Sequence, residues 1–191
     1  FRTCVFLPCA TSLVSYSLIF RSMFATDGLI NSILIKLGIL STGYNFLGNS
    51  ASAKIVIILA LIWRWTGYNM VFYLAGLQNI EYSVYEAAKI DGANRWQLLK
   101  SVILPMLMPT ITICTFLTLT NGFKLFDQNL ALTGGNPGKM SELLALNIYN
   151  TMYGTTGWQG VGQAKAVIFF ILVAIIALAQ NKITTSKEVQ D

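Results

Sequence analysis

Apolar residues dominate four long stretches of the chain, and polar residues gather between them. A helix needs about 20 residues to cross the ~30 Å hydrocarbon layer of a membrane, and each stretch is about that long. The pattern therefore predicts an all-α, polytopic transmembrane helical bundle, with about four spans visible. The predicted spans, in chain order, are Val5–Met23, Ile55–Leu77, Ser101–Phe123 and Val161–Gln180.

Charged residues and prolines distinguish these spans from one another. Ser101–Phe123 is uncharged, and a membrane helix tolerates its Pro105 and Pro109 near the start or as a kink. Arg64 interrupts the second span, whereas Lys165 lies near one end of the fourth, where a long side chain can reach water. The first span is rich in serine and threonine.

Polar segments separate the spans. Phe24–Lys54 contains the sequence GLINSILIKLGIL, which predicts a short helix along the membrane interface. Lys124–Gly160 is rich in glycine and polar residues, so it lies outside the hydrocarbon. Of the 13 basic residues, all but Arg64 divide equally between the two sides of the membrane. The positive-inside rule therefore does not orient the chain.

Composition supports a membrane protein and excludes several other classes. Only 11% of the residues are charged, 54% are hydrophobic and the mean hydropathy is +0.60, which excludes a soluble domain and a disordered chain. The net charge is +5, but the basic residues are spread singly and form no stripe for nucleic acid. The absence of histidine removes histidine catalysis and most zinc sites. We therefore expect no catalytic residues, metal or cofactor.

The segment Gln78–Ser101 predicts two short helices joined by a turn. Ser83 and Glu86 have the spacing of a capping box, and Asp91-Gly92 is a turn signal because glycine adopts the positive φ that ends a helix. Asn94 with Gln97 three residues later has the same capping spacing for the second helix. Such an element either packs against the bilayer or docks a soluble partner.

Specific residues in this segment form a longer motif. The order is E-A-A, three residues, G, nine residues, I-x-L-P, with valine replacing the isoleucine here. The motif resembles the signature of permease subunits of binding-protein-dependent ABC importers. The flanks FRTCVFLP, DGLIN and FDQNLALTGG are similar to the carbohydrate-uptake branch, which includes maltose-type and multiple-sugar permeases. The motif residues are Glu86, Ala87, Ala88, Gly92, Val102, Leu104 and Pro105.

The resemblance implies a type I ABC importer permease domain over residues 1–191. Residues 78–101 would be a cytoplasmic coupling loop seated in a cleft of an ATPase subunit, and residues 124–160 an extracytoplasmic loop facing a substrate-binding protein. The chain would pair with a second permease, homologous or identical, and an ATPase dimer in a prokaryotic inner membrane, and import a sugar or oligosaccharide. The coupling residues carried over from the motif are Glu86, Ala87, Ala88, Gly92, Leu104 and Pro105.

The start of the sequence also bears on this expectation. The chain begins at Phe1 rather than methionine and has no basic-then-apolar signal segment. The resembling family usually has about six spans, so we expect N-terminal spans to be missing from the sequence given.

Several residues keep two interpretations. Glu86 either completes a cap with Ser83 or couples to the ATPase, and both can hold. Arg64, within a span, either lines a substrate pathway, faces the bundle interior, or is shielded by aromatic residues near a missing helix. Asn121 and Asp127 either contact sugar hydroxyls or satisfy loop backbone. The sequence TGGNPGKM is not a phosphate-binding loop, because the glycine and the Ser/Thr that such a loop needs are absent.

Three other classes of membrane protein compete with the importer hypothesis. An ion-driven secondary transporter should carry intramembrane acids or repeated halves, and neither is evident. A membrane enzyme should carry a catalytic set, which is not apparent. A non-transporting scaffold predicts that disrupting Gly92 alters assembly but no solute flux.

Overall fold

The computed structural model describes residues 2–186, so Phe1 and residues 187–191 of the predicted domain lie outside the described part. Within residues 2–186 the regular elements are helices, without a β-strand. They form two compact units, one built from residues 2–67 and 123–170 and the other from residues 68–122 and 171–186.

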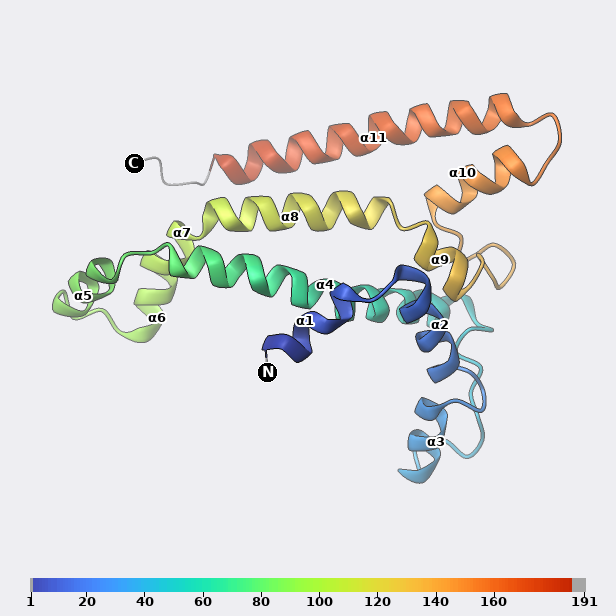
Figure 1. Cartoon of the computed structure of the whole chain (residues 1–191), viewed down its shortest axis with the longest axis horizontal. Coiled ribbons are helices and arrows are strands. Elements are labelled where there is room, and N and C mark those ends of the chain that lie inside the picture. The colour runs from blue at the N-terminus through green and yellow to red at the C-terminus, as the bar shows by residue number, and fades with distance from the viewer. Residues whose placement is uncertain (1, 187–191) are drawn as a thin grey trace. The chain divides into compact units, whose positions relative to one another are not determined.

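Two helices are long and apolar enough to cross a membrane unaided. They are α4, Ser50–Gln78, and α11, Gln159–Thr185 (Figure 1). Both contain a predicted span, Ile55–Leu77 and Val161–Gln180, and extend beyond it at each end. These two predictions are confirmed.

The first predicted span, Val5–Met23, is wrong as a single helix. The structure has α1, Arg2–Ala10, and α2, Leu13–Met23, which meet at 106°. Pro8 has no N–H to give to the preceding turn, and the Thr11 hydroxyl donates to the Pro8 carbonyl at 2.7 Å. A side chain that occupies a helix carbonyl in this way competes with the next turn. The chain therefore leaves α1 and restarts at α2.

The span predicted over Ser101–Phe123 is straight only from Met108. The helical segment that contains this span begins earlier, with the short helix α6, Arg95–Gln97. It continues as a π-helical turn over Leu98–Ile103 and as α7, Leu104–Met106, and then bends by 66° before α8, Met108–Phe123. The two prolines of this stretch cannot donate to carbonyls in the preceding turn, so the regular α-helical ladder is interrupted there.

The first unit has a core that joins segments distant in the sequence. The residues of this core are Tyr16, Phe20, Val56, Ile57, Ala60 and Leu132. They bring α2 and α4 against α9, Asp127–Leu132. The buried Gln128 amide of α9 donates to the Ile57 carbonyl at 2.9 Å. The segment predicted to lie outside the hydrocarbon is therefore folded onto the helices and also contains α10, Leu144–Tyr153.

Candidate functional site

The turn between the two helices of the loop at 78–101 has a defined hydrogen-bonding geometry. Helix α5 spans Tyr82–Ile90, and Gly92 follows it with φ at +76°. The Ala93 N–H donates to the Ala88 carbonyl at 3.0 Å, and the Gly92 N–H donates to the Lys89 carbonyl at 3.2 Å. This pair of bonds is the Schellman motif that ends many helices. The predicted glycine turn is confirmed.

The start of the second helix is capped as predicted. The Asn94 side-chain oxygen accepts from the Trp96 N–H at 3.0 Å and from the Gln97 N–H at 2.9 Å. The Gln97 side chain in turn accepts from the Asn94 N–H at 2.9 Å. This reciprocal capping box fixes the direction in which α6 leaves the turn.

The capping box predicted from Ser83 and Glu86 is wrong. Helix α5 begins at Tyr82, one residue before Ser83, and its N-cap is Glu81. Because Ser83 is already helical, its hydroxyl donates to the Glu81 carboxylate at 3.2 Å instead of accepting a backbone N–H. Glu86 lies exposed on α5. The cap therefore does not account for Glu86.

Large apolar side chains protrude from this otherwise polar loop. Ile90 is 85% exposed, Tyr82 74% and Trp96 70%. A cavity of about 410 Å³ lies between α5 and the start of the second helix. Its lining residues are Tyr82, Tyr85, Glu86, Lys89, Ala93, Arg95 and Leu98. We call this surface, with Ile90 and Trp96, the loop surface.

The six residues assigned to coupling occupy three settings. Glu86 and Ala87 are exposed on α5, whereas Ala88 is buried beneath them. Gly92 makes the turn. Leu104 and Pro105 lie in α7, at the approach to the bend before α8. Sequence reasoning missed Tyr82 and Ile90, although an isolated large apolar residue in a polar segment is a signal that could have found them.

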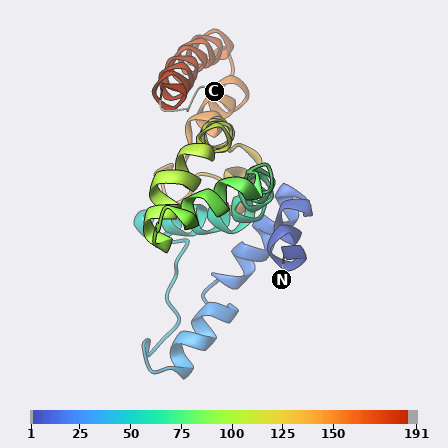
Figure 2. The ribbon, with the colours of Figure 1, turned by 90° about the vertical axis from the view of Figure 1, so that its left-hand side faces the viewer.

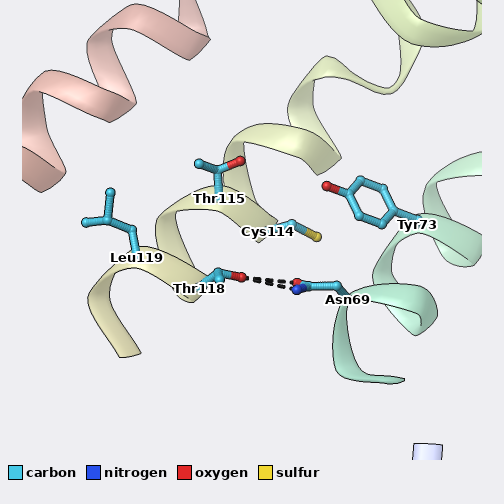
Figure 3. Close-up of a pocket in the computed structure, with 6 residues that line it drawn as sticks. All are labelled: Asn69, Tyr73, Cys114, Thr115, Thr118 and Leu119. Carbon is cyan, nitrogen blue, oxygen red and sulfur yellow. Dashed lines mark hydrogen bonds between the residues drawn. The ribbon is translucent and has the colours of Figure 1, made fainter. Parts of the chain in front are cut away.

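A second cavity lies between α4 and α8, within the unit that also contains the loop at 78–101 (Figure 3). It measures about 420 Å³ and is lined by Asn69, Tyr73, Cys114, Thr115, Thr118 and Leu119. The Thr118 hydroxyl lies 3.2 Å from the Asn69 amide nitrogen and 3.3 Å from its oxygen. The lining offers amide, phenol, thiol and hydroxyl groups and no charge. Sequence reasoning missed it, because its two halves are 49 residues apart.

Arg64 lies at the break between α1 and α2. Its guanidinium donates to the Thr11 carbonyl at 2.7 Å and to the Pro8 carbonyl at 3.3 Å, and lies 5.1 Å from the centre of the Tyr16 ring. The chain break exposes carbonyls at and just after the end of α1. The cation donates to the Thr11 carbonyl and joins the Thr11 hydroxyl at the Pro8 carbonyl, and the ring adds a cation–π contact. This geometry accounts for a charge within a span.

The other two candidate pathway residues lie elsewhere. Asn121 is half-buried near the end of α8, and Asp127 is exposed as the first residue of α9. The residues that line the cavity at Asn69 and Thr118 include none of the three pathway candidates, Arg64, Asn121 and Asp127.

Lys165 of α11 joins a polar network with α10. Its ammonium donates to the Asn147 side-chain oxygen at 2.8 Å and to the Thr151 hydroxyl at 2.7 Å. The Asn147 and Asn150 amides both donate to the Glu142 carboxylate. Burial acts to raise the pKa of Glu142, but these two hydrogen bonds, with the charges of Lys139 and Lys165, leave it below its usual value. The network fixes α10 to the start of α11.

Comparison with known families agrees with this arrangement of helices. Residues 2–186 match the family described as "Binding-protein-dependent transport system inner membrane component". The chain belongs to this family. As a family member it is a multi-pass inner membrane protein, which agrees with the long apolar helices α4 and α11.

Several curated relatives of this family member are sugar permeases. The chain is 41% identical to "Lactose transport system permease protein LacF" of Rhizobium radiobacter, covering 94% of this chain and 61% of the relative. It is 44% identical to "Probable starch degradation products transport system permease protein AmyD" of Thermoanaerobacterium thermosulfurigenes, covering 70% and 46%. It is 34% identical to "Trehalose/maltose transport system permease protein MalF" of Thermococcus litoralis, covering 95% of this chain and 61% of the relative. The chain thus spans about half to two-thirds of these relatives' lengths.

Solved structures place the family member in the type I permease fold. A bacterial ABC transporter described as importing "the acidic polysaccharide alginate" has a TM-score of 0.85 at 23% identity, over 97% of this chain and 64% of that chain. A bacterial alginate ABC transporter in complex with an "alginate pentasaccharide-bound periplasmic protein" has a TM-score of 0.75 at 26% identity, over 96% and 62%.

Proposed function

We propose that this chain is the membrane permease part of an ATP-driven ABC importer that translocates a sugar or oligosaccharide. The loop surface carries the proposal, because a rigid, capped turn there displays large apolar groups beside the spaced E-A-A…G motif. The lactose, starch-product and trehalose/maltose permeases among the relatives support a sugar as the solute.

The partner of the loop surface is, in this proposal, an ATPase subunit in the cytoplasm. Protein interfaces concentrate their binding energy in a few large apolar or aromatic side chains surrounded by polar groups. Ile90 and Trp96 are such side chains, and Glu86, Lys89 and Arg95 are the charges around them. The ATPase hydrolyses the nucleotide, and the loop at 78–101 carries its motion to the membrane.

This assignment also orients the chain. With residues 78–101 in the cytoplasm, residues 124–160 lie on the extracytoplasmic side after one further crossing. There α9 and α10 would meet the substrate-binding protein that delivers the sugar. The alginate transporter complexed with its periplasmic protein supports such a partner. A second permease subunit would complete the pathway.

Replacing Trp96 with serine should release the ATPase from the full-length complex. Trp96 is 70% exposed, and removal of such an anchor typically costs about 2 kcal/mol or more in binding, roughly a 30-fold loss of affinity. The measurement is co-purification in mild detergent with mass spectrometry of the retained proteins. Trp158→Ser is the matched control, because Trp158 is 52% exposed on the other proposed side.

The outcomes of this experiment separate the candidate functions. An ATPase retained by the wild type and the Trp158 variant, but lost from the Trp96 variant, supports the proposal. If the wild type retains no ATPase under conditions that preserve known ABC complexes, the importer proposal is wrong, and ion-driven transport becomes the hypothesis to test.

The cavity between α4 and α8 is, in this proposal, part of the sugar pathway. Its uncharged donors and acceptors can hydrogen-bond the hydroxyl groups of a neutral sugar. A charged solute would find no partner of opposite charge among these residues, and leaving it unpaired there would cost several kcal/mol. Thr118 and Asn69 hold each other's polar groups at the wall of this cavity. A passing hydroxyl can exchange with that contact.

Thr118→Val should lower kcat/KM for sugar uptake roughly tenfold, the effect of losing about 1.4 kcal/mol of hydrogen bonding. The matched control is Thr120→Val in the same helix, because the Thr120 hydroxyl bonds the Phe116 carbonyl of its own helix at 2.8 Å. Uptake of labelled lactose, maltose and arabinose oligosaccharides into proteoliposomes measures the effect. Equal uptake by the two variants would remove the cavity from the pathway.

A further inference from the structure

Helix α3, Leu29–Lys36, belongs to an arm that runs between α2 and α4. Figures 1 and 2 both show α3 and the loop after it projecting away from α2. The buried Asn31 side chain fixes this arm, since its amide donates to the Ala25 carbonyl at 2.9 Å and the Tyr44 carbonyl at 2.8 Å, and its oxygen accepts from the Tyr44 N–H at 2.9 Å. The arm is therefore an ordered element rather than a loose connection.

The arm is held against the end of α2 by a close backbone contact. A Cβ at Gly28 would lie 2.4 Å from the Met23 carbonyl oxygen and 2.5 Å from that of Ser22, which is nearer than side chains approach. Only glycine allows this contact without a shift. Leu29, the first residue of α3, follows Gly28 directly, so the start of α3 lies close to the end of α2.

One side of α3 exposes a row of apolar residues. Leu29, Ile33 and Leu37 recur every four residues, which places them on one side of the helix, and Leu37 and Ile39 are 67% and 65% exposed. Lys36 is the single charged residue between Gly28 and Ala53. An exposed apolar stripe with a cation at its edge is the pattern of a helix that lies in a bilayer interface.

Apolar residues of α2 lie near the start of α3. A cavity of about 380 Å³ joins the two helices and is lined by Ile19, Ser22 and Met23 from α2, Leu29 from α3, and Ala25, Asp27 and Gly28 between them. Ile19 and Leu18 are themselves about half exposed. Ile19 and Met23 of α2 and Leu29 of α3 therefore line one cavity, together with the polar Ser22 and Asp27.

Aromatic residues cluster where the arm joins the rest of its unit. The rings of Phe24 and Phe46 lie 5.6 Å apart, and those of Tyr44 and Phe46 lie 4.9 Å apart. Tyr44 is 41% exposed. Aromatic residues, tyrosine and tryptophan above all, gather where hydrocarbon meets headgroups.

We propose that α3 and the following Leu37–Ile39 lie in the headgroup layer of the phospholipid bilayer, on the side of the membrane opposite the loop at 78–101. Leu29, Ile33, Leu37 and Ile39 enter the acyl-chain boundary, and the Lys36 ammonium meets lipid phosphates. The proposal depends on the membrane location of the family and not on sugar import, so the two can fail separately.

Collision accessibility of spin labels tests this proposal in the full-length complex reconstituted in nanodiscs of phosphatidylethanolamine and phosphatidylglycerol. Labels are attached to Ile33→Cys and Leu37→Cys after the accessible Cys4 and Cys9 are replaced by serine; Cys114 is buried and stays. Oxygen concentrates in lipid, whereas a water-soluble nickel chelate is excluded from it. We expect oxygen collisions to exceed nickel collisions several-fold at both positions.

Three controls give the scale. Leu18→Cys on α2 supplies a lipid reference, Thr155→Cys in the loop before α11 supplies a water reference, and Ser32→Cys on another side of α3 should shift toward the water reference. Strong nickel collisions at Ile33 and Leu37 would show an aqueous arm. Weak collisions with both agents would show a protein, such as the second permease, covering the stripe. Either of these results overturns the proposal.

Discussion

Gly92→Pro is expected to abolish sugar uptake while the protein still inserts into the membrane. Proline fixes φ near −65°, whereas Gly92 has φ at +76°, and proline also lacks the N–H that bonds the Lys89 carbonyl. The turn must therefore open, and the loop surface loses the arrangement of its two helices. Uptake by proteoliposomes and the amount of purified complex measure function and insertion separately.

Gly92→Asn is the matched control for this variant. Nothing lies within 4 Å of a Cβ at this position, so only backbone conformation opposes a side chain there. Asparagine adopts the left-handed conformation far more readily than other residues, and it keeps the N–H. We expect the asparagine variant to retain most of its uptake. Normal uptake by the proline variant would remove the coupling role of this loop.

Arg64→Met is expected to lower the thermal stability of the complex markedly. Methionine fills similar volume but removes the donor to the Thr11 carbonyl at the helix break, whereas the Pro8 carbonyl keeps the Thr11 hydroxyl. Each buried polar group left unpaired costs about 1–3 kcal/mol. The midpoint of thermal unfolding, followed by size-exclusion chromatography of the heated complex, measures the effect.

Arg21→Met is the control for Arg64, because Arg21 is exposed in the last turn of α2. Its loss should leave the unfolding midpoint nearly unchanged. Equal midpoints for the two variants would contradict the stabilising role of Arg64. If Arg64→Met keeps its stability and still loses uptake, the pathway role that the sequence suggests for this residue gains support.

Local features were predictable from the sequence, and features that join distant segments were not. The turn at Gly92 and the cap at Asn94 depend on residues within a few positions, so their spacing was sufficient. The same reasoning failed at Ser83, because a helix that starts one residue earlier turns a capping residue into a helical one. Residue propensities do not decide at which of two neighbouring residues a helix begins.

Contacts across the fold explain the remaining differences. Arg64 bonds residues 53 and 56 positions away, and a sequence pattern gives no means of pairing them. The break after α1 was likewise hidden, since a proline within a span is compatible with an unbroken membrane helix. The cavity at Asn69 and Thr118 requires α4 and α8 to be side by side. The all-helical character and the two unbroken long helices were nevertheless predicted, because hydropathy alone identifies them, whereas the other two predicted spans are bent pairs.

The loop at 78–101 is attached to the membrane by two unequal connections. On one side, α4 runs 29 residues without interruption, about 43 Å, and only Asn79–Glu81 separate it from α5, with Ile80 buried at the junction. On the other side, a π-helical turn and a 66° bend separate the loop from α8. A force applied to the loop would therefore be transmitted through the continuous helix α4 on one side, whereas on the other side the bend before α8 could change its angle. If the ATPase moves this loop as we propose, we expect α4 to follow the motion as one body and α8 to change its angle to the loop at the bend.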